Sequence, residues 1–286
     1  MILKNKRCPT GKSALPFLKW PGGKRWLTPT LLNHLRGQTF ETYHEPFLGG
    51  GALFFALRPS RAVISDINGD LINVYRQVKY HPSSLVNGLQ PLPVTKRTYE
   101  SIRKWQPECV LDRAIRFLYL NRTAFAGMYR LNQNGQFNVP YGGGERTPVA
   151  LWETGLIRTA SRVLQSAQLR VCDFEEVMAA TKAGDLVYCD PTYTVAHNNN
   201  GFVRYNEKNF SWEDQKRLAT CCQAASRRGA LVIVSNACHD ELLRLFDPPR
   251  HFPVVRQNRL CPRIEHRRAT EEYLFIFPPK TCTQRG

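Results

Sequence analysis

Short apolar runs that alternate with stretches of helical spacing constrain the fold of this 286-residue chain more than any other feature. "ALVIVSN" (230–236) is a continuous apolar run, typical of a strand that is buried on both faces of a parallel sheet. Other strands are expected at "TYHEPF" (42–47), "RAVISDIN" (61–68), "LRVCDF" (169–174), "DLVYCD" (185–190) and "EEYLFIF" (271–277). With helices between them, these strands predict an α/β fold with a mixed, mostly parallel sheet.

Two stretches show the helical pattern most clearly. "DLINVYRQV" (70–78) carries apolar residues at three- and four-residue steps, which predicts a helix. "SWEDQKRLATCCQAASRRG" (211–229) is predicted to be a helix with Ser211 as its N-cap. Asp214 would complete a capping box with Ser211, and Gly229 would end the helix.

The middle of the chain has a different character. "TYESIRKW" (98–105) and "LDRAIRFLYLNRTAF" (111–125) read as helices, and 123–146 is rich in Asn, Gln and Gly. Asn134-Gly135 predicts a turn between two short potential strands. We therefore expect a mainly helical insert at 72–147, which divides a core into a first part, 1–71, and a second part, 148–286.

The net charge of +17 points to an acidic partner. Residues 1–40 hold eight Lys or Arg and no acid, and residues 96–170 hold 12 basic and 5 acidic residues. A generically basic surface is the alternative. Nucleic acid is favoured, because neutralising phosphates and releasing counterions rewards such an excess.

Other features narrow the class of protein. No apolar run reaches the roughly 18 residues of a membrane span, and the N-terminus has no apolar segment of a secretory signal. The nine cysteines are scattered and lack metal-ligand spacing. We expect a reduced, cytoplasmic protein without a metal, monomeric in solution.

A glycine loop and an acid suggest a nucleotide-like ligand. "EPFLGGGALFF" places Gly49, Gly50 and Gly51 between a strand and a helix, where the backbone can approach a ligand closely. Asp66 ends the next strand, and an acid there suits the hydroxyls of a ribose. A tight turn and a helix-capping Asp66 are the structural alternatives. The two features together favour a ribose-containing cofactor.

"FLKWPGGKRW" (17–26) combines two tryptophans, lysines and a Gly-Gly turn. It could be a surface turn with an anchored tryptophan. It could also cover a charged ligand, with Trp20 facing a cation and Lys24 a carboxylate.

"DPTY" (190–193) carries the most specific chemistry. The amino group of a nucleobase is a poor nucleophile, because its lone pair is delocalised into the ring. Asp190 could accept one N–H and the Pro191 carbonyl the other, with a direction that the proline ring fixes. Tyr193 offers a face for an extruded base. A polar strand end with a proline turn is the alternative for the tetrapeptide alone.

Five motifs in order, "FLKWPGGK", "EPFLGGGALFF", "SDIN", "FLYLNRTAFAGMYRLNQNGQFNVPYG" and "DLVYCDPTY", closely resemble Dam-type DNA adenine methyltransferases of the D12 class. The resemblance runs from about 17 to 277. It implies a Rossmann-like methyltransferase core and a target-recognition domain at 72–147. It also implies methyl transfer from S-adenosylmethionine to N6 of adenine in double-stranded DNA, with S-adenosylhomocysteine as product.

The resemblance assigns site residues position by position. Contacts to S-adenosylmethionine are implied for Trp20, Lys24, Glu45, Phe47, Gly49, Gly50, Asp66, Asp173, Phe174 and Asp190. Asp190, Pro191 and Tyr193 are the implied catalytic residues. Asp173 and Phe174 are expected at the end of their strand, beside the adenine of the cofactor.

The resemblance also implies contacts to DNA and a target. Arg130 matches a position that reads a guanine edge, and Met128 and Pro140 match apolar base contacts. Lys19 matches a lysine near the first bases, and Arg122 and Asn134 are phosphate contacts. GATC is the leading target.

Two residues depart from the family pattern. Thr192 replaces the usual second proline of the tetrapeptide, which is expected to be tolerated because the acceptor is the carbonyl of Pro191. Ala126 stands where a polar residue is common, which bears on the recognition sequence. The other readings are methylation of cytosine or of RNA adenine, and a DNA-binding protein with a degenerate centre. The first acid of the tetrapeptide, the large basic insert and the intact "DPTY" favour the adenine-specific DNA enzyme.

Overall fold

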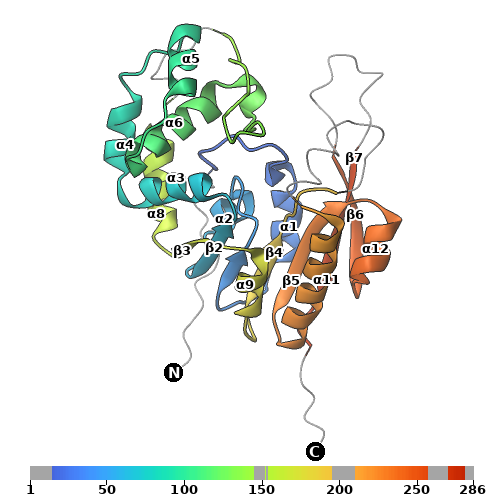
Figure 1. Cartoon of the computed structure of the whole chain (residues 1–286). Helices are drawn as coiled ribbons and strands as arrows, with labels where there is room; N and C mark the ends of the chain where they lie inside the picture. Colours follow the sequence, from blue (N-terminus) through green and yellow to red (C-terminus); the bar gives the residue numbers. More distant parts are fainter. Residues whose placement is uncertain (1–14, 145–151, 153, 195–209, 257–269, 281–286) are drawn as a thin grey trace, which may run out of the picture. The chain divides into compact units, whose positions relative to one another are not determined.

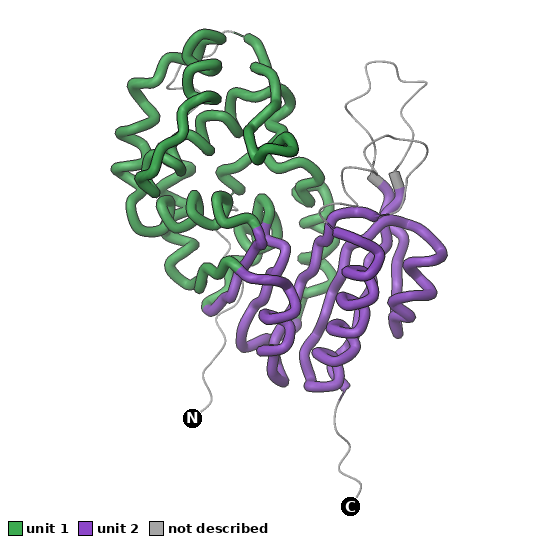
Figure 2. Tube along the Cα trace, in the orientation of Figure 1, with its two compact units in different colours: residues 1–37, 49–60, 68–171 green, residues 38–48, 61–67, 172–286 purple. Residues whose placement is uncertain are grey.

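The computed structural model describes residues 15–144, 152, 154–194, 210–256 and 270–280. The chain forms two compact units, each assembled from segments that are not consecutive in sequence (Figure 2). Unit 1 contains Met1–Gly37, Gly49–Ser60 and Asn68–Val171, and unit 2 contains Gln38–Leu48, Arg61–Ile67 and Cys172–Gly286. The stretch 72–147 falls within unit 1, and its boundaries as a separate insert stay a prediction.

Unit 2 is built on strands in the order β2-β1-β4-β5-β7-β6 (Figure 1). They span Tyr43–Glu45 (β1), Ala62–Asp66 (β2), Leu186–Cys189 (β4), Leu231–Ala237 (β5), Arg250–Arg256 (β6) and Thr270–Phe277 (β7). Strands β2, β1, β4 and β5 pair in parallel, whereas β7 is antiparallel to β5 and β6. The predicted α/β class with a mixed, mostly parallel sheet is confirmed.

The strand order reverses between β1 and β4. From β1 the chain continues to β2 on one side, and from β4 it continues to β5 on the other side. In open α/β sheets, ligands bind beyond the carboxyl ends of the strands at such a reversal. The segments that leave β1 and β4 there begin with Pro46 and Asp190. The topology of unit 2 thus directs attention to these two segments.

Helices α9 (Phe174–Ala179) and α11 (Trp212–Arg227) cover one face of the unit 2 sheet (Figure 1). Leu218 and Cys222 of α11 pack against Val187 of β4 and Val232 of β5 in the hydrophobic core. Helix α12 (Asp240–Phe246) lies between β5 and β6 in the chain. Burial on both faces explains the continuous apolar run of β5, whose residues from 232 to 237 are all buried.

The beginning and the end of α11 match the sequence prediction. Ser211 Oγ accepts a hydrogen bond from the Asp214 amide at 3.2 Å, and the Ser211 amide donates to Asp214 Oδ2 at 2.8 Å. Gly229 follows the helix with φ 94°, a left-handed conformation that glycine adopts at little cost. The predicted capping box and stop are both confirmed.

Unit 1 is mainly helical. It contains η1 (Lys24–Trp26), α1 (Thr28–His34), α2 (Ala52–Leu57), α3 (Gly69–Tyr80), α4 (Pro82–Leu89), α5 (Lys96–Lys104), α6 (Val110–Thr123), η2 (Phe125–Gly127), α8 (Thr154–Leu164) and the strand β3 (Ala167–Val171). Its core includes Phe17, whose ring meets Tyr75 edge-on with centroids 5.0 Å apart. Tyr75 also donates a hydrogen bond to the carbonyl of Gly49 at 3.0 Å, which ties α3 to the glycine loop.

The Asn- and Gly-rich segment after α6 is a loop held by isolated bridges and not by regular strands. The bridges pair Ala124 with Tyr141 and Leu131 with Phe137. Gly135 has φ 73° in the predicted turn, where the Asn132 side chain accepts a hydrogen bond from the Asn134 amide at 3.0 Å. The turn is confirmed, and the two potential strands on either side of it are not formed.

One predicted strand was placed wrongly. "LRVCDF" was expected to be a strand over 169–174, but β3 ends at Val171 and helix α9 begins at Phe174. Asp173 is the N-cap of α9, because its side chain accepts a hydrogen bond from the Glu175 amide at 2.9 Å. The carboxylate that we expected at a strand end thus caps a helix.

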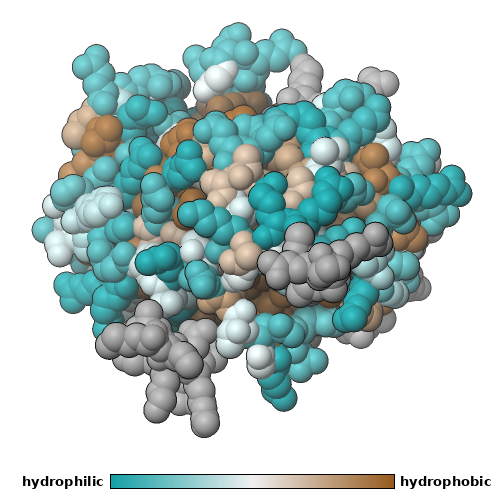
Figure 3. All heavy atoms as spheres, turned by 90° about the horizontal axis from the view of Figure 1, so that it is seen from below, coloured by the Kyte–Doolittle hydropathy of each residue, from teal (hydrophilic) through white to brown (hydrophobic). Residues whose placement is uncertain are grey.

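The face drawn in Figure 3 is mostly hydrophilic, with smaller groups of hydrophobic residues among the polar ones. None of the helices in the described ranges is long and apolar enough to cross a membrane. Lys24, with 5% exposure, is the one buried lysine or arginine of the described residues. The other basic residues of the described chain therefore contribute their charge to the surface.

Candidate active site

The carboxyl ends of β1, β4 and β5 bring polar side chains to one face of the unit 2 sheet. Tyr188 pairs with Ile233, so two residues further on Asp190 lies beside Ser235. Side chains alternate between faces along a strand, which puts Tyr188, Asp190 and Ser235 on one face and Cys189 in the core on the other. The register of β1 and β4, continued by one residue, places Glu45 on the same face as Tyr188.

Asp190 is held at the end of β4 by a hydrogen bond. Its Oδ1 accepts from the hydroxyl of Ser235 at 2.7 Å, and its side chain is half-buried. Pro191 is buried and Thr192 is exposed. The hydrogen bond thus holds the predicted acceptor carboxylate in place. Thr192, which departs from the motif of the resemblance, exposes its side chain.

Tyr193 is half-buried and packs against the hydrophobic core of unit 2. Burial raises the pKa of its phenol well above 10, and the charges of Asp190 and Glu272 and a hydrogen bond with Glu272 raise it further. Glu272 lies on β7 with 3% exposure. Sequence reasoning missed this glutamate, although its place in the apolar strand "EEYLFIF", two residues before Leu274, could have indicated a buried carboxylate.

The charges of three carboxylates raise the pKa of one buried phenol, that of Tyr188, at this edge of the sheet. Burial and then the charge of Asp190 raise the pKa of Tyr188 well above 10, and Glu45 and Glu272 contribute in the same direction. Glu45 has 2% exposure and accepts a hydrogen bond from Tyr43 at 2.8 Å. A region with this much negative charge disfavours anions and favours a cation.

Asp66 ends β2 and is half-buried. It does not cap the helix that follows in the chain, because the N-cap of α3 is Asn68, whose side chain accepts a hydrogen bond from the Leu71 amide at 3.0 Å. The alternative that Asp66 serves only as a helix cap is wrong. Its predicted role at a ribose stays a prediction.

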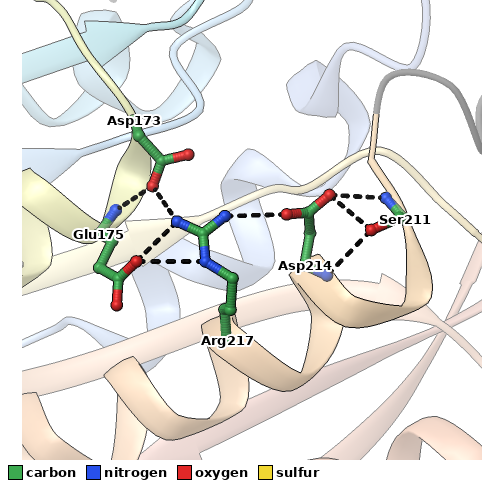
Figure 4. A network of polar contacts seen from close by, with 5 residues as sticks. All are labelled: Asp173, Glu175, Ser211, Asp214 and Arg217. Atoms are coloured by element: carbon green, nitrogen blue, oxygen red, sulfur yellow. Dashed lines mark hydrogen bonds and ion pairs between the residues drawn. The ribbon is translucent and has the colours of Figure 1, made fainter.

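Arg217 of α11 holds Asp173, the residue before Phe174 (Figure 4). Its guanidinium contacts Asp173 at 2.8 Å, Glu175 at 2.6 Å and Asp214 at 2.9 Å. The hydrogen bond to Glu175 is the main reason why the pKa of Arg217 is raised. Sequence reasoning missed this arginine, because Glu175 and Asp173 lie 42 and 44 positions away along the chain.

Phe47 and Phe174, two predicted cofactor contacts, lie side by side. Their ring centroids are 5.3 Å apart in a stacked arrangement, and Phe210 meets Phe47 edge-on at 5.5 Å. Phe174 has 4% exposure, whereas Phe47 is half-buried. The structure therefore brings together the predicted residues that follow β1 and begin α9.

The predicted cofactor contacts of unit 1 form a second group. Gly49 has φ 44°, and a Cβ atom there would lie 2.8 Å from Cδ1 of Trp20, so only glycine fits against the indole. Trp20 also stacks on Phe117 and Tyr129, with centroids 6.4 and 5.9 Å away. Gly50 neighbours the same side chain, since its Cβ would lie 3.2 Å from Cβ of Trp20.

Lys19, a predicted DNA contact, is exposed and held through its backbone. Asn121 accepts a hydrogen bond from the Lys19 amide at 3.0 Å and donates one to the Lys19 carbonyl at 2.6 Å. Gly127 lies so close that a Cβ atom there would be 2.6 Å from Cβ of Lys19. The structure thus brings Lys19 to the loop that carries Met128, while Arg122 lies in the last turn of α6 and is half-buried.

The remaining predicted DNA contacts lie on the same loop. Arg130 is exposed and donates from Nε to Asn138 Oδ1 at 2.8 Å, a bond that uses neither terminal nitrogen of the guanidinium. Asn134 and Pro140 are exposed as well. Ala126 has φ 52°, a left-handed conformation in which Asn is favoured over Ala, which gives a backbone reason for a polar residue at this position.

The sequence model of one protein family, the D12 class N6 adenine-specific DNA methyltransferases, matches residues 20–257 of the chain. The chain belongs to this family. It is an adenine-specific DNA methyltransferase, as the order of its motifs predicted.

Similar proteins are found in bacteria. The chain is 38% identical over 232 residues to the type II methyltransferase M1.LlaDCHI of Lactococcus lactis subsp. cremoris, covering 78% of this chain and 81% of the relative. It is 31% identical over 281 residues to a DNA adenine methylase of Vibrio cholerae serotype O1, covering 96% and 99%. It is 33% identical over 272 residues to the DNA adenine methylase of Escherichia coli strain K12, covering 92% and 95%.

Metal-ligating residue types do not cluster in the described segments of the chain. No group of three or more His, Cys, Asp or Glu side chains there could hold a metal ion. Cys189 and Cys222, both free and buried, face each other within the core of unit 2. Burial and the neighbouring Cys222 raise the pKa of the Cys189 thiol well above 9, which suits an inert thiol.

Proposed function

We propose that this methyltransferase uses S-adenosylmethionine to methylate N6 of an adenine that is flipped out of duplex DNA, by direct displacement. The observation that carries the proposal is the hydrogen bond that fixes the Asp190 carboxylate at the reversal of strand order, 2.7 Å from Ser235. Metal-free methyl transfer to an amino group needs an oriented acceptor of this kind.

The charge at the same edge of the sheet fits the cofactor. The charges of Glu45 and Asp190 both raise the pKa of the buried Tyr188, and Asp66 is a third acid, at the end of strand β2. S-adenosylmethionine supplies an electrophilic methyl group on a sulfonium cation, and carboxylates favour such a cation over the neutral product. Asp66 would accept hydrogen bonds from the ribose hydroxyls, and Phe174 would lie against the adenine of the cofactor.

Asp190 and Pro191 would act on the target base. An ionised carboxylate accepts hydrogen bonds at about four lone-pair positions, so the bond from Ser235 leaves acceptor capacity for an adenine N–H. The Pro191 carbonyl would accept the other N–H. The two acceptors together draw the nitrogen lone pair out of conjugation, which makes the amino group nucleophilic, and Tyr193 would stack on the base.

The loop of unit 1 would read the DNA. The exposed Arg130 can present its terminal guanidinium nitrogens to the O6 and N7 atoms of a guanine, a pair of contacts that discriminates bases. Lys19, whose backbone Asn121 holds, would contact the first bases, with Met128 and Pro140 as apolar contacts. Arg122 and Asn134 would contact phosphates. GATC is the target that these residues favour.

One experiment tests the target base and the sequence together. DNA from cells that express the protein is sequenced for modified bases, and duplex oligonucleotides with and without GATC are incubated with labelled S-adenosylmethionine. We expect N6-methyladenine within GATC. Methylcytosine, or N6-methyladenine in a different sequence, would contradict the corresponding part of the proposal.

A further inference from the structure

A chain of two hydrogen bonds leads from a buried tyrosine to the carboxylate of Asp190. The Tyr188 hydroxyl lies 3.0 Å from Ser235 Oγ, and Ser235 Oγ lies 2.7 Å from Asp190 Oδ1. Tyr188 has 1% exposure and Ser235 has none. Buried hydroxyls that meet a carboxylate at this distance have a fixed arrangement and cannot be replaced by water at no cost.

The direction of both bonds follows from counting hydrogens. An ionised carboxylate can only accept, so Ser235 donates to Asp190. A serine hydroxyl has a single hydrogen, so Ser235 can only accept from Tyr188, which must be the donor. Burial and then the charge of Asp190 raise the pKa of the Tyr188 phenol well above 10, so the phenol retains the proton that it donates.

The register of β4 and β5 builds this chain into the sheet. Tyr188 and Asp190 are two residues apart on the β4 side, so they share a face, and Ser235 is the β5 residue beside Asp190. Neither Tyr188 nor Ser235 needs to reach across a loop. The carboxylate is thus positioned by two paired strands of the sheet, which suits a group that must be placed within a fraction of an ångström.

We propose that Ser235 and Tyr188 are positioning residues for methyl transfer: Ser235 orients the Asp190 carboxylate toward the target amino group, and Tyr188 acts on Asp190 only through Ser235. The inference rests on the proposed function, in which Asp190 accepts an N–H of adenine. It adds a specific dependence, because Tyr188 has no effect on catalysis once the Ser235 hydroxyl is removed.

A double-mutant cycle on kcat tests this dependence. The variants are Ser235→Ala, Tyr188→Phe and the double variant, measured at saturating DNA and S-adenosylmethionine. We expect Ser235→Ala to lower kcat about tenfold or more, in line with loss of a hydrogen bond to a charged group, and Tyr188→Phe to lower it about threefold or more. The double variant should match Ser235→Ala alone. The binding constants for DNA and for S-adenosylmethionine should stay within about twofold of wild type.

Two matched variants separate positioning from folding. Tyr119→Phe also removes a tyrosine hydroxyl that donates a hydrogen bond, here to the Pro93 carbonyl at 2.7 Å in unit 1, and should leave kcat unchanged. Ser235→Thr retains the hydroxyl and should restore most of the kcat that Ser235→Ala loses. If Ser235→Ala does not fold, Tyr188→Phe in wild type and in Ser235→Thr carries the test, with a loss of kcat expected in both.

The outcomes also distinguish this inference from the proposed function. If wild type methylates adenine and Asp190→Ala does not, the proposed function stands. The inference alone is then overturned if Tyr188→Phe leaves kcat unchanged, or if its effect multiplies that of Ser235→Ala in the double variant. Absence of adenine methylation by wild type would overturn both.

Discussion

The guanidinium carbon of Arg217 lies 4.8 Å from the centre of the Phe174 ring, while the same group forms an ion pair with Asp173 at 2.8 Å. One side chain of α11 therefore holds both residues that were predicted to flank the adenine of the cofactor. Arg217 is 40% exposed, so solvent screening limits what each ion pair contributes to stability, and the value of the arrangement lies in orientation.

Replacement of Arg217 by alanine should weaken cofactor binding more than it weakens catalysis. Without the guanidinium, Asp173 and Phe174 lose a fixed orientation, so we expect KM for S-adenosylmethionine to rise about fivefold while kcat changes less than about twofold. Steady-state kinetics at saturating DNA measure both. Lys216→Ala is the control, because among the described residues Lys216 forms an ion pair only with the exposed Glu213 on the same helix. A loss confined to kcat would contradict this role.

Removal of the Asp190 carboxylate should abolish methyl transfer and leave DNA binding largely intact. Asp190→Ala and the isosteric Asp190→Asn both lose the charged acceptor, so we expect kcat to fall by a factor on the order of 10² to 10⁴. Transfer of label to duplex DNA measures kcat, and fluorescence anisotropy measures DNA binding. Methylation by either variant at the wild-type rate would refute the assigned role.

Thr192→Pro should change the rate only modestly, within about threefold of wild type, a change worth less than about 0.7 kcal/mol. The side chain is exposed, and the acceptor carbonyl belongs to Pro191. Thr194→Val, two residues further on, is a comparison variant in which a threonine hydroxyl that is buried is removed. It removes a buried hydroxyl that accepts from Gln215 at 3.1 Å and should cost about 1–3 kcal/mol of unfolding free energy. A loss of several orders of magnitude for Thr192→Pro would show that the third residue is essential.

Gly49→Ala should destabilise the protein more than Gly22→Ala. Both glycines have positive φ, so both substitutions pay the cost of about 1 kcal/mol for a left-handed alanine. Only at Gly49 does the new Cβ meet Trp20, at 2.8 Å, whereas Gly22 has no atom within 4 Å. Urea unfolding of the two variants measures the difference in unfolding free energy. Equal decreases for both variants would show that the Trp20 side chain moves aside at no energetic cost.

The contribution of Asp214 to stability should disappear in acid. Partial burial acts to raise its pKa, but hydrogen bonds from the amide and hydroxyl of Ser211 and from Arg217 outweigh this and lower the pKa below 3.8. The unfolded chain therefore takes up the proton first as the pH falls, so the contribution is complete above about pH 5 and is lost as the pH falls through the folded pKa.

Urea unfolding at several pH values tests this. Wild type should be more stable than Asp214→Asn at neutral pH, and the difference should shrink toward pH 3. A difference that is constant over this range would mean that the negative charge of Asp214 contributes nothing and that only the shape of the capping box matters.

The sequence predicted those features that depend on residues close together in the chain. Ser211 and Asp214 form their capping box across three residues, and Gly135 makes its turn next to Asn134, so local pattern sufficed. The parallel sheet followed from apolar runs such as β5. Asp190 and Tyr193 could be predicted as catalytic residues because the motif around them is contiguous.

The relationships that sequence reasoning missed depend on register and on long-range packing. Ser235 meets Asp190 only because β4 and β5 pair with a particular offset, and no local pattern states that offset. Arg217 reaches Asp173 across 44 residues of sequence, from one helix to the cap of another. The strand predicted at 169–174 is present as β3 but ends at Val171, because Asp173 caps the helix that follows.

The interleaving of the two compact units has a consequence for synthesis. The chain passes from one unit to the other at 37/38, 48/49, 60/61, 67/68 and 171/172. Strands β1 and β2 therefore leave the ribosome long before β4 and β5, the strands that complete their sheet, have been translated. Neither unit can be released by cutting the chain at a single peptide bond, and unit 2 cannot finish folding until most of the message has been read.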